Sequence, residues 1–341
     1  MSSSSPGQQP PYKFYSLYGK RLKSTLALPL PELPAHKPDI TIQTGQKLPK
    51  TLDASPVPSG REWIHDPDRS IVRFYDGAGH IYQFDITENA ANITVSQTWP
   101  VWEDSVFALV NMVMGAVLTL QGHPMFHACS LVHDGRSFLL MGDSGAGKSS
   151  LSIALSAEGL RAHADDVVVI DNIRFPASND RPGIPEPVIS GSGPVVAPGY
   201  PRIKVKPELI ARIGIRGVTP IHIATVEGPE GERWIDTDQL PGGTHRNSAA
   251  IGAIFLLGKR VEGAGQPVVR RLSPMQAAFA LSGHMYGTAW FNPPGPKNLF
   301  MSTYTAEKVP VYEVSLPDDL DVIRESARYL IRNYIENLPV Y

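Results

Sequence analysis

Residues 142–149 read Gly-Asp-Ser-Gly-Ala-Gly-Lys-Ser, which satisfies every fixed position of the phosphate-binding pattern G-x-x-x-x-G-K-[ST]. An apolar run, Phe138–Met141, leads into this stretch and is typical of a buried strand. The mainly apolar residues 151–155 follow it, and Gly159 stands where a helix is expected to end. A strand, a glycine-rich loop and a helix in this order predict a site for a nucleoside triphosphate.

The residue types in the loop explain how it would bind phosphate. Glycines let the backbone turn so that successive N–H groups point inward, and the helix that begins near Lys148 adds its positive end. Lys148 would reach the β- and γ-phosphates, and the Ser149 hydroxyl would ligate Mg²⁺. We therefore expect ATP and Mg²⁺ as ligands, although the loop does not specify the base of the nucleotide. The predicted nucleotide-binding residues are Gly142, Asp143, Ser144, Gly145, Ala146, Gly147, Lys148, Ser149 and Ser150.

The composition is that of a soluble enzyme. Among the 341 residues, 31 Lys and Arg nearly balance 33 Asp and Glu, which favours neither nucleic acid nor an anionic membrane as a partner. A single cysteine, Cys129, excludes an intrachain disulfide and indicates a reducing compartment. The apolar stretch Val106–Leu120 contains Asn111 and is too short to span a bilayer, so we expect a core helix and a cytoplasmic protein.

The N-terminal part is predicted to be a small β-rich domain. Residues 1–11 are mostly Ser, Gln and Pro and predict a disordered tail. Residues 12–103 contain short apolar runs between turn residues. Ile71–Tyr75 and His80–Phe84 alternate as strands do, and Asp76–Gly79 predicts a hairpin turn between them.

Residues 104–341 are predicted to form an α/β P-loop domain. We expect a helix over 105–121, a strand over Ala249–Leu257 and a closing helix over Asp318–Leu338. Residues 173–201 are rich in Pro and Gly and predict an irregular, mobile active-site segment.

A histidine precedes the loop and an acidic pair follows it. His127 lies fifteen residues before Gly142, and a strand through residues 130–132 could lead from it toward the loop. Asp165 and Asp166 lie sixteen and seventeen residues after Ser149, which fits one helix and a return strand beside the first. The ends of such strands cluster, so the acidic pair would face the phosphates.

Two carboxylates at this place could divide the work of phosphoryl transfer. One would hold Mg²⁺, and the other would accept the proton of an attacking hydroxyl. Each feature also has an ordinary interpretation: a solvated turn for Asp165-Asp166, a structural histidine for His127 and a buried apolar role for Cys129. The histidines show no recognised zinc spacing. The catalytic interpretation is favoured because His127, Asp165 and Asp166 all occur at suitable distances from the loop.

The segment from Phe126-His127-Ala128 through the loop to Ala164-Asp165-Asp166 resembles the catalytic domain of HPr kinase/phosphorylase. The resemblance covers residues 123–170 strongly and Ile251–Leu257 weakly. It implies the P-loop fold shared with phosphoenolpyruvate carboxykinases, and transfer of the γ-phosphate to a serine hydroxyl with an Asp of the pair as base. The residues that carry over are His127, Lys148, Ser149, Asp165 and Asp166; we assign the metal to Ser149 and Asp165.

The chain also departs from that family. The Glu-Ile-Arg-Gly segment of HPr kinase has only a displaced echo in Ile215–Gly217, with Gly214 in place of the Glu, so the metal-binding Glu is unassigned and the phosphorylase reaction is left open. The stretch from Tyr18 to Pro34, and Pro201–Lys204, resemble HPr-kinase-related proteins encoded beside lasso-peptide genes. That group phosphorylates the C-terminal Ser of a precursor peptide.

Basic residues outside the loop could complete the site. Arg202, Lys204 and Arg246 are candidates for clamping a phosphate or a substrate carboxylate. We expect an ATP-dependent serine kinase acting on a peptide or small protein, with a homo-oligomer left open. The alternatives are a small-molecule kinase or carboxykinase-like enzyme on the same fold, and a regulatory protein that binds ATP without transferring phosphate.

Overall fold

A computed structural model of the protein describes residues 12–48, 60–66, 68–75, 81–87, 89–97, 102–176, 186–222 and 233–338. The predicted tail 1–11, the hairpin turn 76–79 and part of the predicted mobile segment lie outside these ranges. The chain divides into two compact units, residues 1–106 and 107–341. The fold is mixed α/β, with several sheets that combine parallel and antiparallel pairing.

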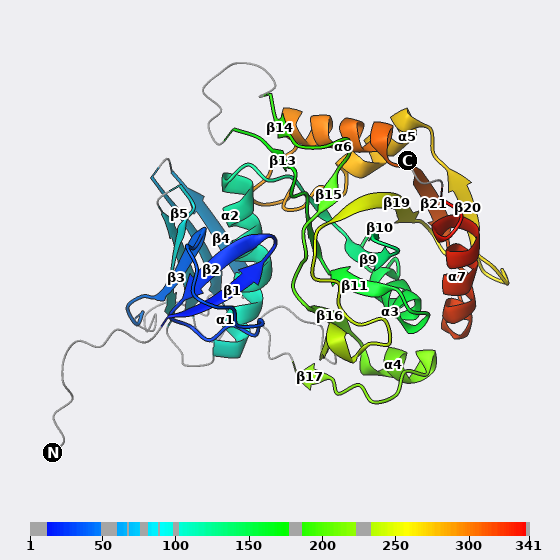
Figure 1. The fold of residues 1–341 in the computed structure, drawn as a ribbon, viewed down its shortest axis with the longest axis horizontal. Helices are drawn as coiled ribbons and strands as arrows, with labels where there is room; N and C mark the ends of the chain where they lie inside the picture. The colour runs from blue at the N-terminus through cyan, green and yellow to red at the C-terminus, as the bar shows by residue number, and fades with distance from the viewer. Residues whose placement is uncertain are drawn as a thin grey trace. The chain divides into compact units, whose positions relative to one another are not determined.

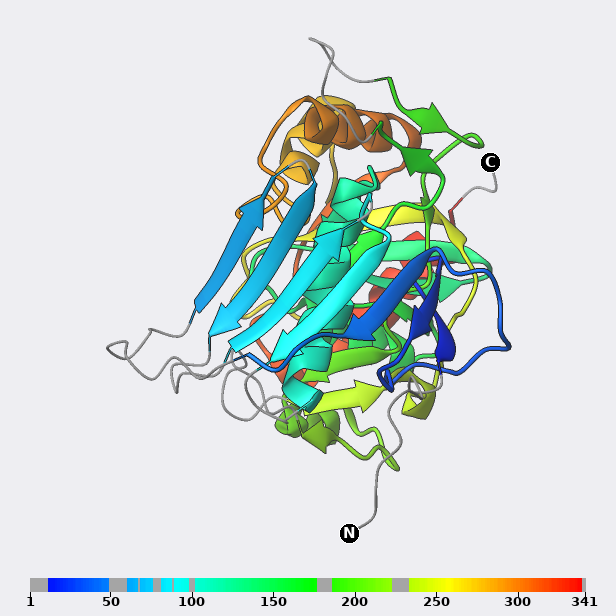
Figure 2. The ribbon, with the colours of Figure 1, turned by 90° about the vertical axis from the view of Figure 1, so that its left-hand side faces the viewer.

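In the first unit, the described residues form one sheet of seven strands in the order β1-β2-β3-β7-β6-β5-β4, visible as the blue to cyan arrows of Figure 2. The strands are β1 (Lys13–Leu17), β2 (Lys20–Ser24), β3 (Ile40–Thr44), β4 (Gly60–His65), β5 (Arg69–Tyr75), β6 (Ile81–Thr87) and β7 (Asn92–Gln97). Strands β5 and β6 pair antiparallel, as the alternation predicted. Val72 and Phe74 on β5, and Phe84 and Ile86 on β6, point into the core because alternate residues share a face.

The second unit is built on a larger mixed sheet, in which the described strands run in the order β11-β9-β10-β19-β21-β20 and β15 pairs with β19 (Figure 1). The strands are β9 (Cys129–His133), β10 (Arg136–Met141), β11 (Arg161–Ala164), β15 (Val195–Val196), β19 (Ala249–Leu257), β20 (Val268–Arg271) and β21 (Val311–Ser315). Strands β10, β19 and β21 are parallel to one another, whereas β9 is antiparallel to both β10 and β11.

Helices cover both faces of this sheet. Phe138 and Leu140 of β10 belong to one apolar core with α3, α4 and α7, and Leu139 and Met141 belong to a second core with α5 and α6. The two cores lie on opposite faces because successive side chains of a strand point in opposite directions. The helices are α3 (Lys148–Ala157), α4 (Pro207–Ile213), α5 (Pro274–Ser282), α6 (Pro296–Lys308) and α7 (Ile323–Leu330).

Shorter elements complete the described part of the chain. They are α1 (Trp102–Ala108), η1 (Leu109–Val113), α2 (Met114–Leu120), β8 (Met125–His127), β12 (Val167–Val169), β13 (Ile173–Arg174), β14 (Val188–Ile189), β16 (Arg202–Val205), β17 (Ile221–His222), β18 (Arg233–Asp236), η2 (Thr237–Gln239), η3 (Leu320–Val322) and η4 (Ile331–Ile335). The helices predicted over 105–121 and 318–338 each contain a π-helical turn, η1 and η4. Within the described ranges, no helix is both long and apolar enough to cross a membrane.

The structure differs from the predicted strand order around the loop in two ways. The strand after α3 is not the neighbour of the strand before it, because β9 lies between β10 and β11. No single strand runs from His127 toward the loop either. His127 is the last residue of β8, which pairs with β12 in a separate two-stranded sheet. The next strand, β9, begins at Cys129.

Candidate active site

Strand direction brings three separate segments to one edge of the large sheet. Strands β10 and β11 both end at this edge, at Met141 and Ala164. Because β9 is antiparallel to both, its beginning at Cys129 lies at the same edge. The loop, the acidic pair and the residues around His127 therefore meet, although the strands are arranged differently from the prediction.

The loop has the backbone that its glycines predict. Gly142, Gly145 and Gly147 have φ values of 146°, 83° and 102°, which favour glycine. A Cβ atom on Gly142 would lie only 2.7 Å from the carbonyl oxygen of Leu257. Gly147 precedes the first residue of α3, so the loop leads directly into the positive end of that helix.

The Lys148 side chain folds back onto the beginning of the loop. Its Nζ donates hydrogen bonds to the carbonyl oxygens of Gly142, at 2.7 Å, and Asp143, at 3.2 Å. Ser149 and Ser150 occupy the next positions of α3 and line the cavity described below. The ammonium group, the two hydroxyls and the helix N-terminus are therefore on one side of the site.

The acidic pair occupies a strained turn. Asp166 has φ +67°, a left-handed conformation that is uncommon for a residue other than glycine. The Val167 N–H donates to the Asp165 carbonyl oxygen at 2.8 Å, which closes a three-residue γ-turn centred on Asp166. Such a conformation costs about 1–3 kcal/mol, and residues that adopt it cluster at active sites, ligand clamps and switch regions. The turn places both carboxylates at the edge where the loop ends.

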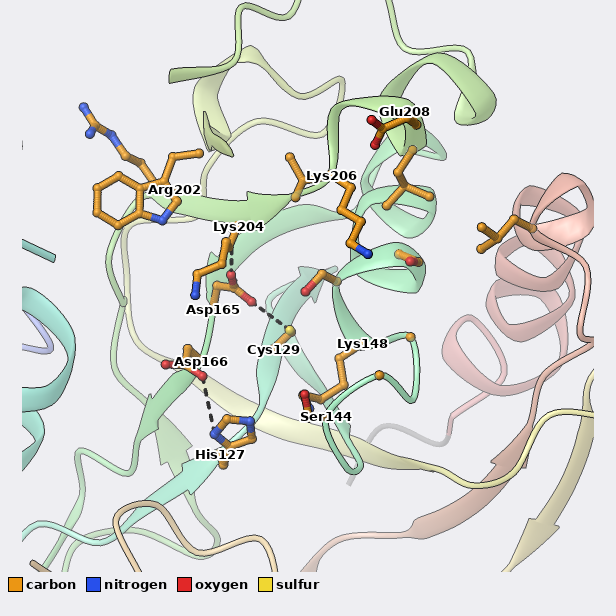
Figure 3. Close-up of a pocket in the computed structure, with 18 of the residues that line it drawn as sticks. His127, Cys129, Ser144, Lys148, Asp165, Asp166, Arg202, Lys204, Lys206 and Glu208 are labelled. Carbon is orange, nitrogen blue, oxygen red and sulfur yellow. Dashed lines mark hydrogen bonds and ion pairs between the residues drawn. The ribbon is translucent and has the colours of Figure 1, made fainter. Parts of the chain in front are cut away.

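Asp165 is fixed by two hydrogen bonds from distant segments. The Cys129 thiol donates to its Oδ1 at 2.8 Å, and the Lys204 backbone N–H donates to its Oδ2 at 3.1 Å (Figure 3). Burial raises the pKa of Asp165, and the nearby charge of Asp166 raises it further, while the two hydrogen bonds lower it. Burial and the charge of Asp165 raise the pKa of Cys129 well above its usual value. Cys129 is thus a protonated donor at neutral pH.

Asp166 faces His127, and both side chains are accessible. The His127 Nδ1 lies 3.4 Å from the Asp166 Oδ1, with 40% and 43% of the two side chains exposed. The imidazole is stacked on the ring of Tyr286, with centroids 6.3 Å apart, and the His127 backbone N–H donates to the His284 carbonyl oxygen at 2.8 Å. The imidazole therefore has a fixed orientation beside a carboxylate that solvent can reach.

The loop, the acidic pair and strand β16 line one cavity of about 770 Å³. Its cationic lining residues are Lys148, Arg202, Lys204, Lys206, Arg212 and Arg260. Its acidic lining residues are Asp165, Asp166 and Glu208. The structure thus brings together His127, the loop residues from Ser144 onward except Ala146, the acidic pair, Arg202 and Lys204. Arg246 is instead paired with Asp238 and is not part of the lining.

Sequence reasoning missed three of the cations, Lys206, Arg212 and Arg260. Arg260 follows β19, which is parallel to β10 and ends at the same edge of the sheet. Its Nη2 lies 3.0 Å from the position that a Cβ on Gly147 would take, so it touches the loop. The predicted strand Ala249–Leu257 was the signal that could have found it, since residues just after that strand belong to the same edge.

The oxygen ligands in the site suit Mg²⁺ carried by a nucleotide. The described residues include no group of three or more His, Cys, Asp or Glu that could hold a metal. The Ser149 hydroxyl and the Asp165 carboxylate are hard oxygen donors, and both residues line the cavity. Mg²⁺ is commonly held by one or two protein oxygens, substrate phosphates and water, so a small donor set fits this ion.

The chain matches no protein-family model and no curated protein. Among solved structures it is similar to the Hpr(Ser) kinase/phosphatase from Coxiella burnetii. The two are 17% identical with a TM-score of 0.28, over 62% of this chain and 99% of that one. A likeness of this size establishes neither a family nor an activity for this chain.

Proposed function

We propose that the protein is an ATP-dependent, Mg²⁺-requiring kinase that transfers the γ-phosphate to a serine hydroxyl of a peptide or small protein. One observation carries the proposal: the glycine-rich loop and the strained Asp165-Asp166 turn line the same cavity. A structural turn would not need two carboxylates at the edge where a triphosphate loop ends. The presence of both Asp165 and Asp166 in this lining argues against a regulatory protein that binds ATP without transferring phosphate.

The loop side of the cavity holds the donor. Backbone N–H groups of residues 142–149 and the start of α3 bind the phosphates, and Lys148 turns from the loop carbonyls toward the β- and γ-oxygens. Ser149 and Asp165 would hold Mg²⁺, which would neutralise charge on the phosphate oxygens. The two hydrogen bonds on Asp165 orient its carboxylate for this role.

The acidic side prepares the acceptor. Asp166 accepts the proton of the serine hydroxyl while the serine oxygen forms a bond to the γ-phosphorus and the bond to the ADP oxygen breaks. Asp166 is the better candidate for the base because its carboxylate is accessible and lies beside His127. Positioning and charge neutralisation supply most of the rate in such a reaction, so no covalent enzyme intermediate is needed.

Mass spectrometry of candidate acceptors tests the proposal. The full chain is incubated with ATP, Mg²⁺ and acceptors that include HPr, small peptides encoded beside the gene and a lasso-type precursor ending in Ser. We expect one added phosphate on a serine with the wild type and with Lys308→Ala, an exposed lysine outside the cavity. The phosphate should disappear with Lys148→Ala. Tight ATP binding without transfer to any peptide, protein or small molecule would support a regulatory protein instead.

A further inference from the structure

Strand β16 presents cations to the cavity because its residues alternate. Ile203 and Val205 are buried in the apolar core, so Arg202 and Lys204 stand on the other face of the strand. Strand β18 pairs antiparallel with β16, and Trp234 lies directly opposite Lys204 in the register. The face of this small sheet that lines the cavity is therefore cationic and aromatic.

Arg202 lies against two aromatic rings. Its guanidinium carbon is 5.8 Å from the centroid of Tyr200 and 5.6 Å from that of Trp234. Asp236 is the cross-strand neighbour of Arg202, yet no ion pair within 4 Å joins the two in the described structure. Rings that hold a guanidinium limit its motion and leave its N–H edge able to form a bidentate pair with a carboxylate.

Tyr200 adds a buried hydroxyl group to the same part of the cavity. The residue is 3% exposed, and its Oη lies near the Arg202 guanidinium but forms no hydrogen bond of normal geometry with the residues that the structure describes. Burial raises the pKa of Tyr200 well above its usual value, although the charge of Arg202 lowers it. The group is therefore a neutral O–H donor at physiological pH. Buried polar groups are rarely left unsatisfied in native proteins, so an acceptor oxygen of a ligand at this hydroxyl would complete its hydrogen bonding.

The position of these residues relative to the acidic pair defines what they can contact. The Lys204 backbone N–H is bonded to Asp165, and the Lys204 Nζ lies 4.8 Å from the centroid of the Phe107 ring. In Figure 3, Arg202 lies beyond Lys204, on the side away from Lys148. Arg202 and Lys204 are two residues apart on β16, which corresponds to roughly 6.6 Å along the strand. An extended peptide lying beside the strand would cover this distance with about two residues.

We propose that Tyr200, Arg202, Trp234 and Lys204 form an anion subsite that binds a carboxylate of the acceptor, from an acidic residue within about two positions of the accepting serine. The link to a serine rests on the proposed function, whereas carboxylate binding by the subsite does not. The acceptor class is thus an acidic peptide segment. The same chemistry argues against a lysine- or arginine-rich acceptor, because like charges across an interface repel.

A pair of peptide libraries tests the subsite by binding alone. Both carry a central Ser and a fluorescent label; the two positions on each side contain Gly, Ala, Asp and Glu in the acidic library, and Gly, Ala, Asn and Gln in the amide library. Fluorescence anisotropy gives the apparent Kd for each. We expect wild-type protein to bind the acidic library about tenfold more tightly, the effect of one charge-assisted hydrogen-bonded pair.

Variants of Arg202 test whether this residue causes the preference for the acidic library. Arg202→Gln should remove it, Arg202→Lys should keep part of it, and Arg270→Gln, an exposed arginine outside the cavity, should keep all of it. Thermal unfolding verifies that each variant is folded. A fluorescent ATP analogue should bind all four proteins equally. Equal binding of the two libraries to wild type, or a loss of nucleotide affinity in Arg202→Gln, would overturn the subsite.

The two proposals can fail separately. An acidic preference without phosphate transfer to any acceptor would contradict the kinase and leave the anion subsite standing. Phosphate transfer at equal rates to the acidic and amide libraries, with equal binding, would support the kinase and contradict the subsite.

Discussion

The cavity has two walls that are built in different ways. The loop wall, residues 142–149, is continuous in sequence, and its shape depends on three glycines with positive φ. The acid wall is drawn from three separate segments of the chain: His127 and Cys129, Asp165 and Asp166, and Lys204. A local backbone determines the first wall, whereas hydrogen bonds between distant segments determine the second. In the proposed kinase, the loop wall would bind the triphosphate and the acid wall would carry out the proton transfer.

Replacing Asp166, the proposed base on the acid wall, should have the largest effect on transfer. Asp166→Asn removes the proton acceptor, and Asn tolerates the left-handed conformation that the turn requires. We expect the rate of serine phosphorylation to fall by about 10²–10⁴-fold while ATP affinity is retained. Single-turnover phosphorylation and nucleotide binding, measured on the same samples, separate the two effects.

The structure offers a matched control for that variant. Asp134 also has a positive φ, +47°, and its side chain is 82% exposed in a turn outside the cavity. Asp134→Asn should leave both transfer and ATP binding unchanged. If Asp166→Asn retained the wild-type rate, Asp166 would not be the base.

Replacing Lys148 on the loop wall should affect both phosphate transfer and ATP binding. Lys148→Ala removes the ammonium group that would neutralise the β- and γ-phosphates. We expect transfer to fall by about 10²–10³-fold, with weaker ATP binding as well. A transfer defect with unchanged nucleotide affinity would show that the loop wall and the acid wall are less distinct than we infer.

The same contrast explains how much the sequence could predict. The strand before the loop, the helix after it and the glycine conformations follow from local residue types, and all three are present in β10, α3 and the φ values. The position of β9 between β10 and β11 depends on long-range pairing and was missed. For the same reason, the sequence named Asp165 and Lys204 as candidates but could not show that one is bonded to the other.

Replacing Cys129 should change the pH dependence of activity through the pKa of Asp165. Its thiol lowers the pKa of Asp165, which burial has raised, so Cys129→Ala should raise that pKa further. In the proposed mechanism Asp165 must be ionised to hold the metal, so activity should fall as the pH drops through its pKa. The acid limb of the kcat/KM profile, which reports the free enzyme, should therefore move to higher pH in Cys129→Ala. Cys129→Ser, which restores a donor, should return the limb toward its wild-type position.

A smaller effect concerns the support behind the loop wall. Glu158, just after α3, accepts hydrogen bonds from Arg324 at 2.8 Å and Arg328 at 2.9 Å. Burial alone would raise the pKa of Glu158, but these hydrogen bonds lower it. A lowered pKa means that the contribution to stability is present above the ordinary carboxyl pKa and is lost as the pH falls through the folded-state value.

Urea unfolding measures this contribution. Glu158→Gln should lower the free energy of unfolding by about 1 kcal/mol at neutral pH, and the difference from wild type should close in acid. Glu307→Gln, an exposed glutamate on α6, should change little at either pH. A difference for Glu158→Gln that does not depend on pH would rule out the ion pairs as its cause.

The affinity for ATP with and without Mg²⁺ tests most directly whether the two walls act on one ligand. In wild-type protein, Mg²⁺ should strengthen ATP binding, because Ser149 on the loop wall and Asp165 on the acid wall would both hold the ion. We expect Asp165→Asn to lose most of this gain, whereas Lys148→Ala should bind ATP weakly but retain the gain from Mg²⁺. An undiminished Mg²⁺ gain in Asp165→Asn would contradict a shared site.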